Sequence, residues 1–250
     1  MTPADFLAAH GFGAAERVPL PADASFRRYE RLIGGPVPAL LMLCPPGREP
    51  IAPFLRIAAH LRGLGLSAPE VYFADETAGL ALIEDLGEDT FTALLARGED
   101  ETALYVLAAE ALAHLHRHAA PVGVPAWDAD TMTTAAAATL LDWWWPAAFG
   151  APPGQHVQAG FTEAVREMLA PFADSAPVLV HRDFHVDNLL RLARPGAAAC
   201  GLLDFQDAGA GHPAYDVMSL LEDARRDIDP AVRRAALARY LDAAPVADRA

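Results

Sequence analysis

The chain contains no lysine: all 19 of its basic residues are arginine, against 33 acidic residues. The formal net charge is −14 over 250 residues. A protein of this sign repels a polyanion, and the arginines are scattered rather than clustered, so nucleic acid is not expected as a partner. Together with the abundant alanine, the missing lysine indicates GC-rich codon usage. The missing lysine also means that any permanently cationic side chain required at a functional site must be arginine.

Cysteine and long apolar runs are scarce as well. Cys44 and Cys200 are the only two cysteines and lie far apart, so neither a disulfide framework nor a cysteine metal site is predicted. The N-terminus has no basic stretch followed by an apolar run, and the most apolar region, residues 135–150, is broken by Asp142 and Pro146. We therefore expect a cytoplasmic protein without a signal peptide or a membrane partner.

The first 86 residues predict a small antiparallel sheet with a helix packed on it. Residues alternate from Phe26 to Ile33, and a short apolar strand follows the turn at 34–36, so residues 16–45 are expected to form a hairpin. Apolar positions at helical spacing indicate a helix over residues 50–64. Further expected elements are a short helix over residues 2–9, capped by Thr2, and two strands within residues 71–86.

From residue 87 onward the pattern becomes helical. Helices are expected over residues 102–119, 131–145, 160–174 and within 213–244, with two apolar segments around polar loops between them. The sequence thus predicts an α+β fold with two lobes. A β-rich lobe of residues 1–86 is joined, through a hinge at residues 82–89, to a larger and mainly helical lobe of residues 87–250.

One polar stretch interrupts the apolar segments, VLVHRDFHVDNLLRL at residues 178–192. His181, Arg182, Asp183 and, five residues after the aspartate, Asn188 match the catalytic-loop pattern H-R-D-x-x-x-x-N of protein kinases. A carboxylate such as Asp183 can take the proton of a phosphoryl acceptor. An amide such as Asn188 can hold a divalent cation without adding charge beside that base.

A second carboxylate comes from GLLDFQDAG at residues 201–209, where Asp204 ends an apolar strand. Gln206 stands where protein kinases have the glycine of D-F-G, so the strict pattern fails there. Asp216 then opens a helix. The order of these motifs behind an N-terminal sheet favours a phosphoryl-transfer site over a set of plain polar turns.

These segments, with LIEDLGEDTF at residues 82–91, resemble the aminoglycoside phosphotransferase-like kinases. DASFRRYERL at residues 23–32 is more particular and resembles the bacterial kinases that phosphorylate the anomeric hydroxyl of N-acetylmuramate and N-acetylglucosamine in cell-wall recycling.

The resemblance implies a bilobal protein-kinase-like fold that uses ATP and Mg²⁺. Asp183 would be the catalytic base, Asn188 and Asp204 the metal ligands, and His181 and Asp216 orienting residues. The resemblance also places Ser25, Phe26, Arg27 and Arg28 at the phosphates, and the backbone of Glu84, Asp85 and Leu86 at the adenine.

The missing lysine is a departure from that family. Kinases of this kind place a strand lysine on the nucleotide phosphates, and by position it would fall near Met42. Arg28 or Arg31 on the neighbouring strand is a candidate for the cation, although a planar guanidinium cannot reproduce the geometry of an ammonium group.

The acceptor site is less defined by the sequence. Trp143, Trp144 and Trp145 are interpreted either as helix-interface residues, at least one of them buried, or as a stacking wall for a sugar ring. His185 and Asp207 are further acceptor-binding candidates, and a structural role for His185 is equally compatible. The histidines of LAHLHRH, residues 112–118, are expected to be ordinary helix residues rather than metal ligands.

Two alternatives to an amino-sugar kinase stay open. One is an aminoglycoside, choline or homoserine kinase of the same fold. The other is a catalytically inactive nucleotide-binding module, which the missing lysine and the short stretch after Asp216 suggest. The complete set of Asp183, Asn188 and Asp204 argues against inactivity.

Overall fold

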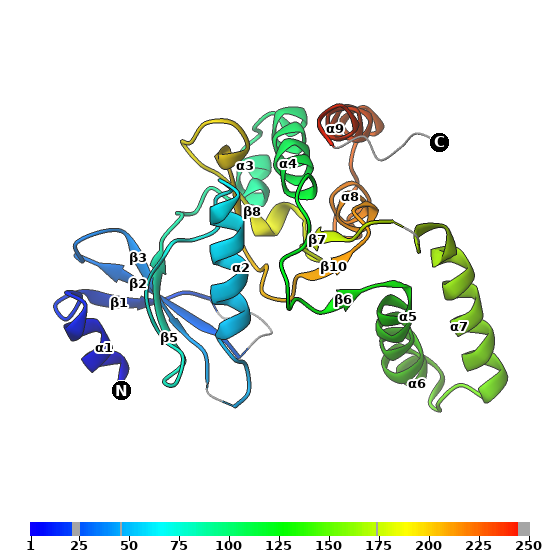
Figure 1. The fold of residues 1–250 in the computed structure, drawn as a ribbon, viewed down its shortest axis with the longest axis horizontal. Helices are drawn as coiled ribbons and strands as arrows, with labels where there is room; N and C mark the ends of the chain where they lie inside the picture. Colours follow the sequence, from blue (N-terminus) through cyan, green and yellow to red (C-terminus); the bar gives the residue numbers. More distant parts are fainter. Residues whose placement is uncertain (22–25, 46, 174, 245–250) are drawn as a thin grey trace.

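The computed structural model describes residues 1–21, 26–45, 47–173 and 175–244 and confirms the α+β architecture (Figure 1). An N-terminal five-stranded antiparallel sheet has the order β1-β2-β3-β5-β4. A mainly helical part with two small sheets follows it along the chain. The strands of the large sheet are β1 Glu16–Pro19, β2 Arg28–Ile33, β3 Ala39–Leu43, β4 Val71–Asp75 and β5 Leu80–Glu84.

The central strands β3 and β5 are buried on both faces, and their alternation divides the core in two. Leu41 and Leu82 pack with α1 (Pro3–Ala9), whereas Met42 and Ile83 pack with α2 (Ala52–Gly63). Side chains two residues apart on a strand share a face, so each helix covers one face of the sheet. Thr2 caps α1 as predicted, through a reciprocal capping box with Asp5.

The hairpin predicted over residues 16–45 contains a further strand, β1, for which the sequence gives no signal. All four of its residues are exposed, so no alternation of polar and apolar positions marks it as a strand. It pairs with β2 alone and ends at Pro19 on the edge of the sheet, where a missing N–H is tolerated.

The helical part is built around α4 (Glu101–His116), which is buried along most of its length. The expected helix over residues 131–145 is instead α5 (Ala129–Ala137), a π-helical segment (Ala138–Trp144) and α6 (Trp145–Phe149). The six-residue α3 (Phe91–Ala96) was not predicted, because it is too short to show a period. The other elements are β6 Ala126–Trp127, α7 Gln155–Leu169, β7 Val178–Val180, β8 Leu189–Arg191, β9 Cys200–Leu202, β10 Gly209–Gly211, α8 Ala214–Leu221, α9 Pro230–Ala243 and three 3₁₀ turns, Ala170–Phe172, Val186–Asn188 and Gly196–Ala199.

The helical part also contains two small sheets and an extended contact between two helices. Strands β6, β10 and β7 form a three-stranded sheet, and β8 pairs with β9 as a hairpin. Helix α9 packs along α4 at the end of the described chain (Figure 1). Among the described helices, none combines the length and the apolar character that a bilayer crossing requires.

Both cysteine thiols are expected to be unreactive in the folded protein. Cys44 and Cys200 are buried, and burial raises the pKa of Cys44 to about 11 and raises the pKa of Cys200 further. Because the thiolate is the nucleophile, dithionitrobenzoate at pH 8 should label neither thiol in the native state and both in guanidinium chloride. Rapid labelling of one native thiol, assigned with a serine variant at each position, would contradict the burial described here.

Candidate active site

A cavity of about 240 Å³ lies against the segment that leaves β5. Its walls come from the sheet, from α2 and from the β8–β9 hairpin, so three parts of the chain that are distant in sequence meet there. The lining residues that matter for chemistry are Arg31, Leu40, Ile83, Glu84, Asp85, Leu86, Asn188, Leu190, Asp204 and Phe205.

The loop between β7 and β8 is held by a carboxylate from α8. Asp216 is 0% exposed, and its two oxygens accept the backbone N–H groups of His181, at 2.7 Å, and Arg182, at 2.9 Å. Arg182 has a φ of +77°, a conformation that costs energy for a residue with a side chain. The pair of hydrogen bonds to Asp216 therefore fixes an otherwise unfavourable turn directly before Asp183.

Asp183 has its backbone held while its carboxylate stays available. Its carbonyl oxygen accepts the N–H of His185, at 3.1 Å, and Nδ2 of Asn188, at 2.9 Å. Within the described chain no hydrogen bond or ion pair to the Asp183 carboxylate is found, and the residue is partly exposed. The fold therefore holds the backbone of Asp183 and leaves its carboxylate available to accept a proton from a substrate.

Asn188 is oriented by its neighbours in the loop. Its Nδ2 faces the Asp183 carbonyl and also lies 3.3 Å from Nε2 of His185. Nδ1 of His185 lies 3.6 Å from Asp187, which in turn accepts the hydroxyl of Thr92 from α3. Since the amide nitrogen faces inward, the amide oxygen of Asn188 points the other way, and Asn188 lines the cavity.

Asp204 also lines the cavity, and strand pairing brings it beside Asn188. Leu189 pairs with Leu202, and the N–H of Leu203 donates to the carbonyl of Asn188, at 2.9 Å. Asp204 adopts a φ of +59°. The β8–β9 hairpin therefore places two potential metal ligands, the amide of Asn188 and the carboxylate of Asp204, on the same wall of the cavity.

Gln206, the residue that breaks the D-F-G pattern, has a visible role. Its Nε2 donates to Oδ1 of Asp204, at 2.8 Å, which a glycine could not do. Phe205 between them is buried and stacks on Phe54 of α2, with ring centroids 5.1 Å apart. The Asp204 turn is thus fixed from both sides. The protein-kinase pattern has a glycine at this position, so it could not predict a role for Gln206.

The donor set fits a cation that is shared with a ligand. No group of three or more His, Cys, Asp and Glu side chains suited to a metal ion occurs in the described ranges. Asn188 and Asp204 supply a short set of hard oxygen ligands, which suits Mg²⁺ because that ion keeps waters and phosphate oxygens in its shell.

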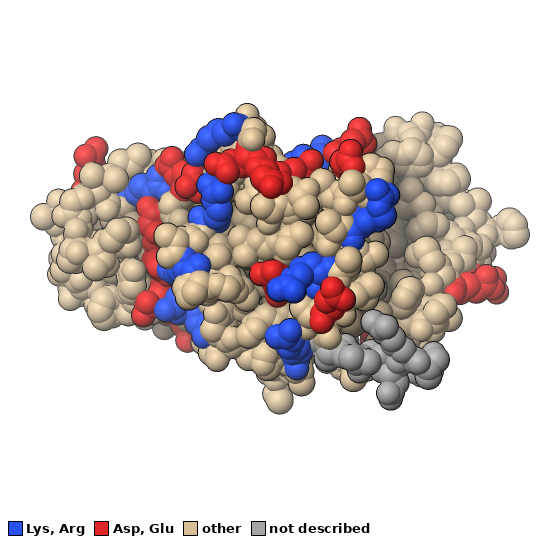
Figure 2. Space-filling model, turned by 90° about the horizontal axis from the view of Figure 1, so that it is seen from above, with Lys and Arg blue, Asp and Glu red and all other residues tan. Residues whose placement is uncertain are grey.

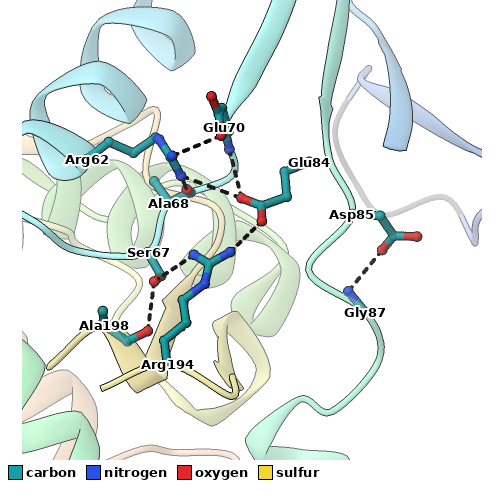
Figure 3. A network of polar contacts seen from close by, with 9 residues as sticks. All are labelled: Arg62, Ser67, Ala68, Glu70, Glu84, Asp85, Gly87, Arg194 and Ala198. Atoms are coloured by element: carbon teal, nitrogen blue, oxygen red, sulfur yellow. Dashed lines mark hydrogen bonds and ion pairs between the residues drawn. The ribbon is translucent and has the colours of Figure 1, made fainter. Parts of the chain in front are cut away.

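The predicted hinge is tied to the β8–β9 hairpin by a polar network (Figure 3). The carboxylate of Glu84 contacts Arg194 from that hairpin and lies 3.5 Å from Arg62 of α2. It also accepts the N–H of Glu70, and Arg194 donates to the hydroxyl of Ser67, at 2.8 Å. The side chain of Glu84 is therefore committed to structure, and its backbone N–H donates to the carbonyl of Glu70, at 2.8 Å.

Asp85 is committed in the same way. It forms a two-pronged ion pair with Arg31, at 2.6 and 3.2 Å, and accepts the N–H of Gly87. Arg31 contacts Glu88 as well. Leu86 lies between these residues on the cavity wall.

The predicted phosphate segment is only partly described, because Ser25 lies outside the described residues. Phe26 is exposed, with its N–H donated to Glu49 at 3.0 Å. Arg27 is buried, and its Nη2 lies 3.4 Å from Asp204. Arg28 is exposed, and its side chain has no hydrogen bond or ion pair within the described chain.

The three tryptophans lie apart from this cavity. Trp143 is 77% exposed, Trp144 is exposed and Trp145 is partly buried, and among the described residues that line the cavity none of the three occurs. They belong to the end of the molecule formed by α5 to α7, which carries few charges in Figure 2. None of the three is fully buried and none lines this cavity, so the stacking wall for a sugar ring stays a prediction.

Two other predicted residues lie close to the catalytic loop. The carbonyl of Asp207 accepts Nη1 of Arg182, at 3.0 Å, and the same guanidinium lies 3.9 Å from the ring centre of Trp127. His181 is fully buried, and burial lowers its pKa, so it stays neutral at physiological pH. Trp127 was not predicted as part of the site, since no motif marks it.

A buried chain of polar groups behind Asp216 was also not predicted. Nδ1 of His116 lies 2.8 Å from the hydroxyl of Tyr240 on α9, and its Nε2 lies 3.5 Å from Asp216. When the hydroxyl donates to Nδ1, the ring proton lies on Nε2 and faces the carboxylate. His116 is therefore a polar brace behind the loop rather than an ordinary helix residue.

Comparison with known sequences places these observations in a family. The sequence model described as "Phosphotransferase enzyme family" matches residues 16–250. The N-acetylmuramate/N-acetylglucosamine kinase of Caulobacter vibrioides is 36% identical, over 98% of this chain and 77% of its own length. The enzyme of the same name from Pseudomonas aeruginosa is 31% identical, over 94% of this chain and 69% of its own length.

Solved structures share the fold at low sequence identity. The streptomycin–ATP–APH(2″)-IIa ternary complex superposes with a TM-score of 0.66 at 16% identity, covering 96% of this chain and 82% of that one. Choline kinase LicA of Streptococcus pneumoniae also gives 0.66, at 13% identity, covering 98% and 83%. These likenesses confirm the kinase-like fold.

Proposed function

Because this chain belongs to the phosphotransferase enzyme family, we propose that it transfers the γ-phosphoryl group of Mg²⁺-bound ATP to the anomeric hydroxyl of N-acetylmuramate or N-acetylglucosamine. That it is a small-molecule kinase follows from the family and from the names of relatives that align over most of the chain. The observation that carries the chemistry is that the Asp183 carboxylate has no hydrogen-bond or ion-pair partner within the described chain, while the Asp183 carbonyl lies 2.9 Å from the amide nitrogen of Asn188, which lines the cavity together with Asp204.

In this proposal Asp183 orients the acceptor hydroxyl and takes its proton. The hydroxyl oxygen forms a bond to the γ-phosphorus while the bond from that phosphorus to the bridging oxygen breaks, which releases ADP. Asp216 contributes by holding the loop backbone at His181 and Arg182. Catalysis then rests mainly on positioning and on charge neutralisation around a loose transition state.

The divalent cation would be held by the amide oxygen of Asn188 and the carboxylate of Asp204. It would neutralise phosphate charge, so an acidic chain could bind a polyanionic nucleotide. His185 and Gln206 support this site, because they orient Asn188 and Asp204 through contacts of 3.3 and 2.8 Å.

The adenine would lie in the 240 Å³ cavity against the backbone of residues 84–86. Leu40, Ile83 and Leu190 give the cavity apolar walls suited to a flat base. We propose on this basis that residues 1–86 form the nucleotide-binding lobe. Residues 87–250 would then supply the catalytic loop and the acceptor site.

The test is a measurement of Mg²⁺-dependent ADP release over a panel of acceptors. N-acetylglucosamine and N-acetylmuramate should each support turnover that EDTA abolishes and excess Mg²⁺ restores. Methyl glycosides of the same sugars, which lack a free anomeric hydroxyl, should be inactive and serve as matched controls. Turnover with kanamycin, choline or homoserine but with neither N-acetyl sugar would overturn the substrate assignment and leave the kinase chemistry intact.

A further inference from the structure

Arg27 carries a buried positive charge at the edge of the proposed metal site. Its side chain is only 6% exposed, with Nε 2.7 Å from Oε1 of Glu49 and Nη2 3.4 Å from Oδ1 of Asp204. Burial of a guanidinium is costly unless acidic partners or a bound anion compensate for the lost hydration. Glu49 and Asp204 compensate for that cost, and they hold the guanidinium beside the proposed metal ligand.

The guanidinium lies where β2 begins, beside the end of β3. On β3, Met42 pairs with Tyr29, the second residue of β2, and is apolar and fully buried against α2. The strand that would carry a lysine in related kinases thus offers no cation here. The charge of Arg27 acts on Cys44, which lies directly after β3. Burial raises the pKa of this thiol, and Arg27 opposes that rise.

Glu49 orients this guanidinium from the segment that precedes α2. One of its oxygens faces Nε of Arg27, and the other accepts the N–H of Phe26, at 3.0 Å. Glu49 therefore holds both the backbone at Phe26 and the side chain of Arg27. With Nε directed at Glu49, the terminal nitrogen Nη2 is turned toward Asp204.

The other arginines of this strand do not occupy an equivalent position. Arg28 is exposed on the strand. Arg31 is bound by Asp85 and Glu88 at the hinge. In the described part of the chain, Arg27 is the arginine whose ion pairs join the sheet to Asp204.

We infer that the Arg27 guanidinium binds the phosphates of the nucleotide next to the metal, and that Glu49 is its positioning residue. The pair takes the place of the strand lysine and its carboxylate partner, with the cation supplied by the residue that precedes β2 instead of by β3. A planar fork of this kind can donate two hydrogen bonds to phosphate oxygens, which an ammonium group cannot do in a fixed plane. This inference rests on the proposed function.

Calorimetric binding of ADP and of adenosine separates a phosphate contact from general damage. R27M should weaken ADP binding by about 10-fold to 100-fold, because charge-assisted hydrogen bonds are lost, while adenosine binding stays within twofold. R27K should restore part of the loss. The matched control is R17M, which breaks the Arg17–Glu30 ion pair on the outer side of the same sheet and should change neither affinity.

The role of Glu49 is tested by kinetics. E49Q should raise KM for ATP several-fold while KM for the sugar stays unchanged, and E49Q combined with R27M should be no worse than R27M alone. E30Q, the matched control on the outer pair, should match wild type.

Four outcomes would overturn the inference. Equal ADP affinity in R27M and wild type would remove the phosphate contact, and a loss confined to R28M would assign it to the exposed arginine instead. Equal losses for ADP and adenosine in R27M would indicate a structural role only. Failure of the wild-type chain to bind either ligand would instead overturn the proposed function, and the inference with it.

Discussion

Replacing Asp183 with asparagine should lower kcat by about 10²- to 10⁴-fold, the range found when a positioned general base is removed. Asparagine keeps the size of the side chain but cannot accept the proton of the sugar hydroxyl. Within the described chain the Asp183 carboxylate has no hydrogen-bond partner, so the fold should not depend on it. ADP affinity and thermal stability should therefore stay close to wild type, measured by calorimetry and thermal unfolding.

Asp187 provides a matched control in the same loop. It is exposed and contacts Thr92 and His185, and an asparagine can keep the hydrogen bond to the threonine hydroxyl. Asp187→Asn should change kcat by less than tenfold. If Asp183→Asn retained more than a tenth of wild-type kcat, or if both variants lost activity equally, the assignment of Asp183 as the base would be wrong.

The catalytic loop could be predicted from the sequence because its chemistry is local. Asp183 and Asn188 are five residues apart, and one short turn brings the Asn188 amide to the Asp183 carbonyl. Asp204 could be found as well, since it ends an apolar strand that pairs with the strand after Asn188. Residue type and spacing together define these positions.

Asp216 was expected as a support of the loop, but the residues behind it could not be predicted, because they come from distant segments. Tyr240 lies 124 residues after His116, and nothing in either helix marks the hydrogen bond between them. Glu49 precedes α2 in a stretch without a motif, and its partner Arg27 was expected among several arginines of one segment. Such contacts are set by how helices and sheet pack, which a period or a spacing does not describe.

The same limit applies to the elements that were missed. Strand β1 has four exposed residues, so it lacks the alternation that identifies a strand, and only its pairing with β2 defines it. The apolar run of residues 138–144 was expected to continue as an α-helix, but it forms a π-helical segment that leaves Trp143 exposed. Hydrophobic residues on a surface cannot be told from core residues by composition alone.

Replacing Asp216 with alanine should destabilise the fold and remove activity together. The backbone N–H groups of His181 and Arg182 would be left buried without acceptors, at a total cost of about 3 kcal/mol or more in unfolding free energy. For a chain of this length, that corresponds to a Tm lower by about 6 to 12 °C. Denaturant titration and differential scanning calorimetry measure both quantities.

Asp216→Asn separates the stability effect from the effect on catalysis. Its single amide oxygen can accept one of the two N–H groups, while its NH₂ group opposes the other, so the left-handed turn at Arg182 loses half of its support. The variant should fold with an intermediate Tm yet lose much of its kcat, because Asp183 follows that turn directly. Tyr240→Phe, which removes only the hydrogen bond to His116, should cost about 1 kcal/mol, and Asp242→Ala on the exposed face of α9 should cost less than about 0.5 kcal/mol. Wild-type kcat in a folded Asp216→Asn variant would show that the loop keeps its geometry without this carboxylate, and the positioning role given to Asp216 would have to be withdrawn.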